Sequence, residues 1–100
     1  MPAVIRVGDF STGHDCFHPT ALLGSPVRKT KFNNKFPGVV SNACQHASHT
    51  CGKTTHPNNT RVPSSGASKT FIEGFRAARI GDPIACGDTC GEGSHNSFIE

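Results

Sequence analysis

Apolar residues along the chain come in pairs and triplets, and they rarely recur at the spacing of three and four that an α-helix needs. Phe71-Ile72 is typical, because Gly, Pro or Asn interrupts each such group before a second helical turn could form. The pattern predicts short strands joined by turns, and therefore an all-β fold.

Two hairpins can be placed within this pattern. The clearer one covers residues 69–80, where Glu73-Gly74 supplies a tight two-residue turn between alternating segments. A weaker one covers residues 31–36, because the pair Asn33-Asn34 tolerates the positive φ angles that such turns require.

The same segments repeat along the chain. Arg6-Val7-Gly8-Asp9 recurs as Arg79-Ile80-Gly81-Asp82, and residues 66–71 match residues 93–98 at identical spacing. Gly24-Ser25-Pro26 leads to a further copy with a short insertion. Repeated units that cannot bury a face alone must pack on one another. We therefore expect three β-hairpin repeats around a pseudo-threefold axis, forming a body with turns at one end and ligand loops at the other.

Composition limits how such a fold can be stabilised. The chain has 100 residues, of which 34% are hydrophobic, so we expect one domain over residues 1–100 with a thin core. Small domains of this kind are commonly held by disulfides, a metal or a partner chain. Five Cys and six His are the candidates.

Charge and targeting signals change the picture little. The net charge is +3, and the chain has one basic cluster, which consists of Arg28, Lys29, Lys31 and Lys35. The chain has no Trp or Tyr that could stack on nucleic-acid bases. A solvated strand or loop is the simpler interpretation of that cluster. No apolar run approaches the roughly 20 residues of a membrane span, and Arg6 and Asp9 interrupt the stretch where a signal peptide would be apolar.

The odd number of cysteines favours metal binding over disulfides. Five Cys cannot pair completely within one chain, and a reducing cytoplasm keeps thiols free. The Cys and His are therefore expected to bind a metal.

The motifs resemble the PAAR-repeat family. Residues 76–83 are similar to its Pro-Ala-Ala-Arg element, with Arg76 in place of the Pro, and Ala85-Cys86-Gly87 follows as in the family's C-terminal module. Residues 6–14, ending in Ser-Thr-Gly-His, resemble the first module of the phage-associated branch, and residues 47–57 its His-x-Cys and Thr-His segments. In the middle module, residues 39–42 replace the usual Arg-Val-Gly-Asp.

This resemblance implies a structural protein and not an enzyme. It implies a tip that caps the trimeric β-helical spike of a contractile injection machine and sharpens it for puncturing the target cell membrane. The partner would be the spike trimer, a phage central spike or a VgrG-like β-helix, with one copy of this chain per spike and no nucleic acid. The location would be the tail baseplate spike tip of a phage virion, or the bacterial cytoplasm before export through a type VI secretion system.

The resemblance also implies one structural Zn²⁺ near the point of the cone. The ligands carried over are His14, His49, His56 and Cys86. Imidazole nitrogen and thiolate are ligands that zinc prefers, and a closed four-ligand shell is structural. The reserve ligands are Cys51, His46 and Cys44. We read the remaining candidates as non-ligands: Cys16, His18, Cys90 and His95. Because Cys16 and Cys90 hold similar places in two repeats, a second site or a disulfide formed after export stays open.

Two other classes of function stay open on the residues alone. A zinc hydrolase would need an open coordination position and a general base, but the chain has no His-Glu-x-x-His pattern. A small zinc-binding module for nucleic acid or protein would use Cys-x-x-Cys knuckles, and only the wider Cys86 to Cys90 spacing is present. The phenylalanines at positions 32, 36, 71, 75 and 98 are expected in the core and the base of the cone, where an exposed apolar patch would mark a protein interface.

Overall fold

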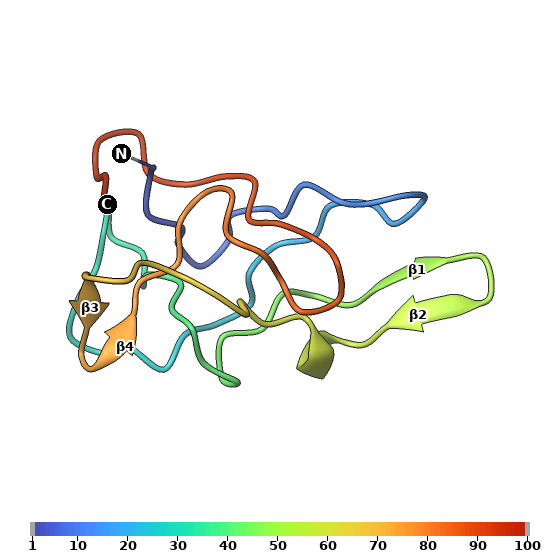
Figure 1. Ribbon diagram of the computed structural model, residues 1–100, viewed down its shortest axis with the longest axis horizontal. Helices are drawn as coiled ribbons and strands as arrows, with labels where there is room; N and C mark the ends of the chain where they lie inside the picture. The colour runs from blue at the N-terminus through green and yellow to red at the C-terminus, as the bar shows by residue number, and fades with distance from the viewer. Residues whose placement is uncertain (1, 100) are drawn as a thin grey trace.

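The computed structural model describes residues 2–99 and contains short antiparallel pairings with almost no helix (Figure 1). Strands β1 (His49–Cys51) and β2 (Thr54–His56) form one hairpin, and β3 (Phe71–Ile72) and β4 (Phe75–Arg76) form another. The only helical element among these residues is the 3₁₀ turn η1 (Asn58–Thr60). No helix of residues 2–99 has the length and apolar character to cross a membrane. The predicted all-β class is confirmed.

Three distant segments of the chain meet around a pseudo-threefold axis through two sets of three backbone hydrogen bonds, called here the rings. The first ring is closed: the N–H of Ile5 donates to Ala78 O at 3.2 Å, the N–H of Ala78 donates to Gly38 O at 3.0 Å, and the N–H of Gly38 donates to Ile5 O at 2.8 Å. In the second ring each donor lies two residues later and each acceptor two residues earlier, so that the N–H groups of Val7, Val40 and Ile80 donate to the carbonyl oxygens of Phe36, Arg76 and Ala3. The expected pseudo-threefold arrangement of three repeats is therefore present in the backbone.

These rings also fix the alignment of the middle repeat. Because Ile5, Gly38 and Ala78 are equivalent, Val39 stands where the other repeats have Arg6 and Arg79. Residues 39–42 thus occupy the place of the Arg-x-Gly-Asp motif although they share none of its residues.

The Arg-x-Gly-Asp motif forms the same turn in both repeats that carry it. The Asp9 carboxylate accepts the backbone N–H of Arg6 at 2.9 Å and two hydrogen bonds from the Arg6 guanidinium, at 2.9 and 3.1 Å. Asp82 accepts the corresponding three bonds from Arg79, at 2.7, 3.1 and 2.9 Å. The intervening glycine has φ of +98° in the first turn and +92° in the second, which explains its place in the motif.

Both hairpin turns expected from the sequence are present. Glu73 and Gly74 have φ of +51° and +88° between β3 and β4, and Asn33 and Asn34 have φ of +55° and +64° between the bridged residues Phe32 and Lys35. Positive φ at both central positions is the geometry that suits a two-residue hairpin.

The segment near the C-terminus completes the first repeat. Ala3 bridges Phe98, and the N–H of Val4 donates to Ser97 O at 3.0 Å, as that of Ala77 donates to Thr70 O in the third repeat. Gly93 and Gly66 hold equivalent places in these two repeats. A Cβ on Gly93 would lie 2.7 Å from Val4 O, and a Cβ on Gly66 would lie 2.5 Å from Ala77 O. The first repeat is therefore assembled from both ends of the described chain.

The molecule is elongated, with extents of 38 × 24 × 22 Å. Figure 1 shows the β3–β4 hairpin and the two chain ends at one end, called here the broad end. Only the β1–β2 hairpin and the loop that includes residues 14–17 extend to the other, called here the tip. The cone-like shape that the family resemblance implies is confirmed.

The core consists of small and aliphatic side chains and not of the phenylalanines. Val4, Ile5, Leu22, Val39 and Ile84 are among its buried members. Phe71 and Phe98 are 56% and 51% exposed, and the other three phenylalanines that we expected to pack inside are only half-buried. The expectation is therefore confirmed in part: Phe32 and Phe75 pack against the buried cluster, whereas Phe71 and Phe98 are exposed.

Candidate metal centre

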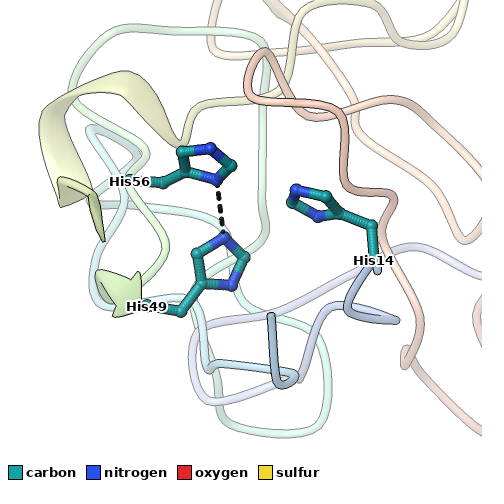
Figure 2. Close-up of side chains that lie close together, drawn as sticks. All are labelled: His14, His49 and His56. Carbon is teal, nitrogen blue, oxygen red and sulfur yellow. Dashed lines mark hydrogen bonds between the residues drawn. The ribbon is translucent and has the colours of Figure 1, made fainter. Parts of the chain in front are cut away.

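Three histidines from two tip loops converge at the base of the tip (Figure 2). His14 opens a tight turn in which its backbone exchanges two hydrogen bonds with Phe17, at 3.1 and 2.8 Å. His49 begins β1 and His56 ends β2. One ring nitrogen from each of the three histidines lies within 4.8 Å of the others.

The β1–β2 hairpin explains why His49 and His56 meet. The two residues are direct partners in the antiparallel register, so their side chains project from the same face. Gly52, with φ of +62°, lies in the connection between the strands. His49 Nε2 lies 3.0 Å from His56 Nδ1, close to the ~3.3 Å that separates two nitrogen ligands on a tetrahedral zinc ion.

The tautomer of His49 is set by its surroundings. Its Nδ1 lies 3.0 Å from the carbonyl oxygen of His18 and donates to it, which leaves the Nε2 lone pair directed at the other histidines. Burial lowers the pKa of His49, and the positive charge of Arg61 adds to this effect against the opposing His18 hydrogen bond. A neutral imidazole is the form that binds a metal, and here the Nε2 of His49 accepts a hydrogen bond from Arg61 Nη1 at 3.0 Å.

His14 carries the clearest sign of an absent ligand. Its Nδ1 is buried and has no hydrogen-bond partner, and an orphaned buried nitrogen costs about 1–3 kcal/mol. A metal ion bound among the three rings would satisfy such a nitrogen. The donor set therefore fits a metal.

The Phe17 ring covers the three histidines. Its centroid lies 4.8, 4.6 and 4.1 Å from those of His14, His49 and His56. The ring is stacked on two of the three imidazoles and limits the access of water to the cluster.

Cys86 lies beside the cluster without joining it directly. Its half-buried Sγ accepts a hydrogen bond from Arg61 Nη1 at 3.0 Å, and the same Nη1 lies 3.0 Å from His49 Nε2. A Cβ on the next residue, Gly87, would lie 3.9 Å from the His14 ring. The structure thus groups His14, His49 and His56, and places Cys86 on the far side of one guanidinium nitrogen.

Two reserve ligands are buried outside this cluster. Burial lowers the pKa of His46 to about 4 and raises the pKa of the Cys44 thiol to about 11. The Cys44 Sγ accepts the N–H of Val39 at 3.4 Å in the core. Cys90 is buried too, and its pKa is raised to about 12. Burial therefore favours the protonated form of both thiols, and both lie outside the histidine cluster.

The third reserve ligand, Cys51, forms a disulfide with Cys16. This corrects the expectation that the cysteines bind metal in preference to pairing, and it removes Cys51 from the candidate ligands. The turn at residues 14–17 runs beside β1 and brings the two Cα atoms to 5.5 Å, a normal disulfide separation. Three thiols remain free, those of Cys44, Cys86 and Cys90.

Sequence reasoning missed Arg61 and Phe17. Arg61 is completely buried and touches two of the expected ligands, yet no local pattern separates it from a surface arginine. Its one signal is the Arg61-Val62 pair, which repeats Arg6-Val7 at the start of the first motif. Phe17 could have been noted only for its place between His14 and His18.

The fold and the histidine cluster define a small all-β repeat protein with a candidate metal centre at its tip. Residues 18–91 match the PAAR motif family, and the chain belongs to that family. The predicted resemblance is confirmed.

One relative is a much longer protein. A stretch of 65 residues, 63% of this chain, is 36% identical to the double-stranded DNA deaminase toxin A of Burkholderia cenocepacia (strain H111). This chain spans 5% of that protein's length. The likeness therefore concerns one small part of the relative.

Proposed function

We propose that this protein is the pointed cap of a trimeric β-helical spike in a contractile injection machine. Membership of the PAAR motif family supports the proposal, and the backbone rings around the pseudo-threefold axis carry it. A single chain that repeats its backbone three times around one axis can present an equivalent edge to each of three spike subunits.

The broad end is the surface that would dock on the spike. It carries the two hairpin turns and the exposed rings of Phe71 and Phe98. Strands of only two residues leave backbone groups at their edges, and a partner with open strand ends would pair with them. Exposed aromatic rings beside such edges are typical of a protein interface.

The tip would be stabilised by one Zn²⁺ bound to His14, His49 and His56, with Cys86 as the fourth ligand. A zinc ion in such a closed shell has a structural role, and its binding contributes directly to folding free energy. It would join the loops that carry His14, the β1–β2 hairpin and Cys86 at a point where few apolar residues can pack. The rigidity of this point is what membrane puncturing requires.

The proposed machine is either a phage tail baseplate or a type VI secretion system. The Ser-Thr-Gly-His segment after Asp9 supports the phage machine, whereas the toxin name of the Burkholderia relative supports delivery of an effector. The cap would be located at the spike tip in both, and it would reach the target membrane first.

Docking can be tested with a purified trimeric β-helical spike protein from each kind of machine. We expect a complex with one copy of this chain per spike trimer, measured by size-exclusion chromatography with light scattering. Phe71→Asp at the broad end should abolish the complex, because it places a carboxylate where a ring is buried on docking.

The matched control for docking is Thr54→Asp, which adds the same charge to exposed β2 at the tip. This variant should still bind. Equal binding by wild type and Phe71→Asp, or a ratio of three chains per trimer, would contradict the proposal.

A further inference from the structure

The most buried charged side chain of the described residues belongs to Arg61, which follows η1 and has no exposed surface. Its Nε donates to Ala47 O at 2.7 Å. Nη1 contacts His49 Nε2 and Cys86 Sγ, both at 3.0 Å. Nη2 contacts Asp88 Oδ2 and Ser11 Oγ, each at 3.2 Å, and also the Thr20 hydroxyl. Every nitrogen of the guanidinium therefore has a partner.

These partners belong to all the segments that carry expected ligands. Ser11 precedes His14 by three residues, Ala47 precedes His49 by two, and Asp88 follows Cys86 by two. Arg61 itself follows His56 by five residues. One planar group thus joins the segments before any ion binds.

The positive charge of Arg61 does not exclude a second cation nearby, because Asp88 compensates it. Both side chains of this ion pair are fully buried. The Asp88 carboxylate also accepts hydrogen bonds from the Thr12 hydroxyl at 2.9 Å and from the backbone N–H of Thr89 at 2.8 Å. The Arg61–Asp88 ion pair is locally neutral. The Nη1 group of Arg61 still donates to Cys86 Sγ.

We propose that Arg61 is a positioning residue of the metal centre, holding the Cys86 thiol beside the histidine cluster through the hydrogen bond from Nη1 to Sγ. The inference rests on the metal centre proposed above and names a residue outside its ligand set. Hydrogen bonds to ligands from outside the coordination shell orient them and tune metal affinity, and their loss typically costs about 10- to 100-fold in affinity. The bond from Nη1 to Cys86 Sγ is of this kind.

Lysine cannot replace Arg61 in this role. A lysine keeps the charge but has one ammonium in place of a planar fork, so it cannot reach the sulfur, the imidazole and Asp88 together. Arg61→Lys therefore separates charge from positioning. The matched control is Arg6→Lys, which changes another buried arginine, paired with Asp9 and in contact with Asn33 and Gly93.

The test is a Co²⁺ titration of the oxidised protein, followed by visible absorption, with thermal unfolding of the metal-free protein measured in parallel. Wild type should bind one Co²⁺ and show a sulfur-to-cobalt charge-transfer band. Arg61→Lys should bind Co²⁺ about 10- to 100-fold more weakly and shift or lose that band. Arg6→Lys should lower the unfolding temperature and leave both affinity and band unchanged. A purely structural Arg61 would produce the Arg6→Lys result.

A second pair of variants applies if Arg61→Lys does not fold. Ser11→Ala removes one acceptor of the guanidinium, and Ser25→Ala removes a buried serine at a distance from the guanidinium, where Oγ accepts the N–H of Val27. Only Ser11→Ala should weaken Co²⁺ binding. Wild-type affinity and spectrum in both Arg61→Lys and Ser11→Ala would overturn this inference alone. A wild-type protein that takes up no Co²⁺ would overturn the metal centre and this inference together.

Discussion

At the residue scale, the Arg-x-Gly-Asp turn shows how four residues can specify their own structure. The carboxylate accepts a backbone N–H and two guanidinium N–H groups, and the glycine supplies a φ that other residues rarely adopt. Each of these contacts lies within the motif. The turn therefore forms the same way in two repeats with different neighbours.

Asp9→Asn tests this turn. The amide keeps the shape but cannot accept the same set of charged hydrogen bonds, and it leaves the buried Arg6 guanidinium without its counter-ion. We expect the free energy of unfolding to fall by about 3 kcal/mol, as measured by urea denaturation. Glu92→Gln, at an exposed acceptor of the Phe10 N–H, should cost far less. Equal small losses in both variants would contradict the assigned role.

His46 should make stability depend on pH. Burial, with the charge of Arg61 adding to it, lowers the pKa of His46 from 6.5 to about 4 in the folded protein. Between these values the unfolded chain binds the proton and the folded protein does not, so stability falls as the pH drops from about 6.5 to about 4. Below about 4 both states are protonated and this contribution stops changing.

The measurement compares wild type with His46→Leu across that pH range. The free energy difference between the two proteins should change by up to about 3 kcal/mol in favour of the variant as the pH falls, while contributions from the other histidines cancel. A constant difference between wild type and His46→Leu would show that His46 does not titrate this way.

At the element scale, the tip consists of two short hairpin-like loops joined by the Cys16–Cys51 disulfide. Neither loop has a core of its own. The disulfide joins the loop that carries His14 to the hairpin that carries His49 and His56. The three imidazoles are therefore held in place by one covalent link and several backbone hydrogen bonds. Positioning of the histidines therefore belongs to the pair of loops and not to either alone.

Removing the disulfide should destabilise the protein. Cys16→Ser with Cys51→Ser should lower the free energy of unfolding by about 2–4 kcal/mol, because the link closes a long loop in the unfolded chain. Thermal unfolding in the presence of zinc gives the comparison. Thiol titration of the unreduced, denatured wild type should find three thiols. Five thiols would contradict the pairing.

At the scale of the whole molecule, the repeats are held by rings of backbone bonds at the axis and by side chains at the tip. The rings join segments at residues 3–7, 36–40 and 76–80, so each repeat depends on the other two. The apolar core around them is made of small side chains. A bound metal would therefore affect stability beyond the tip itself.

Metal removal tests this dependence. Chelation of Zn²⁺ should lower the free energy of unfolding of the whole chain. The expected loss is about 4 kcal/mol, compared with the same protein in free Zn²⁺ at 1,000 times the dissociation constant of the site. His14→Ala should remove most of this difference. Hydrogen exchange should show reduced protection of backbone amides in the β1–β2 hairpin and, to a smaller extent, around the axis. Identical unfolding with and without Zn²⁺ would contradict the metal centre.

The sequence by itself determined the features that depend on neighbouring residues. Turn geometry at Asn33-Asn34 and Glu73-Gly74, the Arg-x-Gly-Asp turns and the threefold repetition all follow from local chemistry or from internal copies. The histidines at positions 14, 49 and 56 could be named as a group from the family resemblance, and the structure brings them together.

Only the tertiary structure decided which distant groups share a site. The Cys16–Cys51 pairing, the burial of Arg61 and the exposure of Phe71 depend on contacts between segments far apart in the chain. No local preference distinguishes a buried arginine from an exposed one, because the difference lies in acceptors that other segments supply.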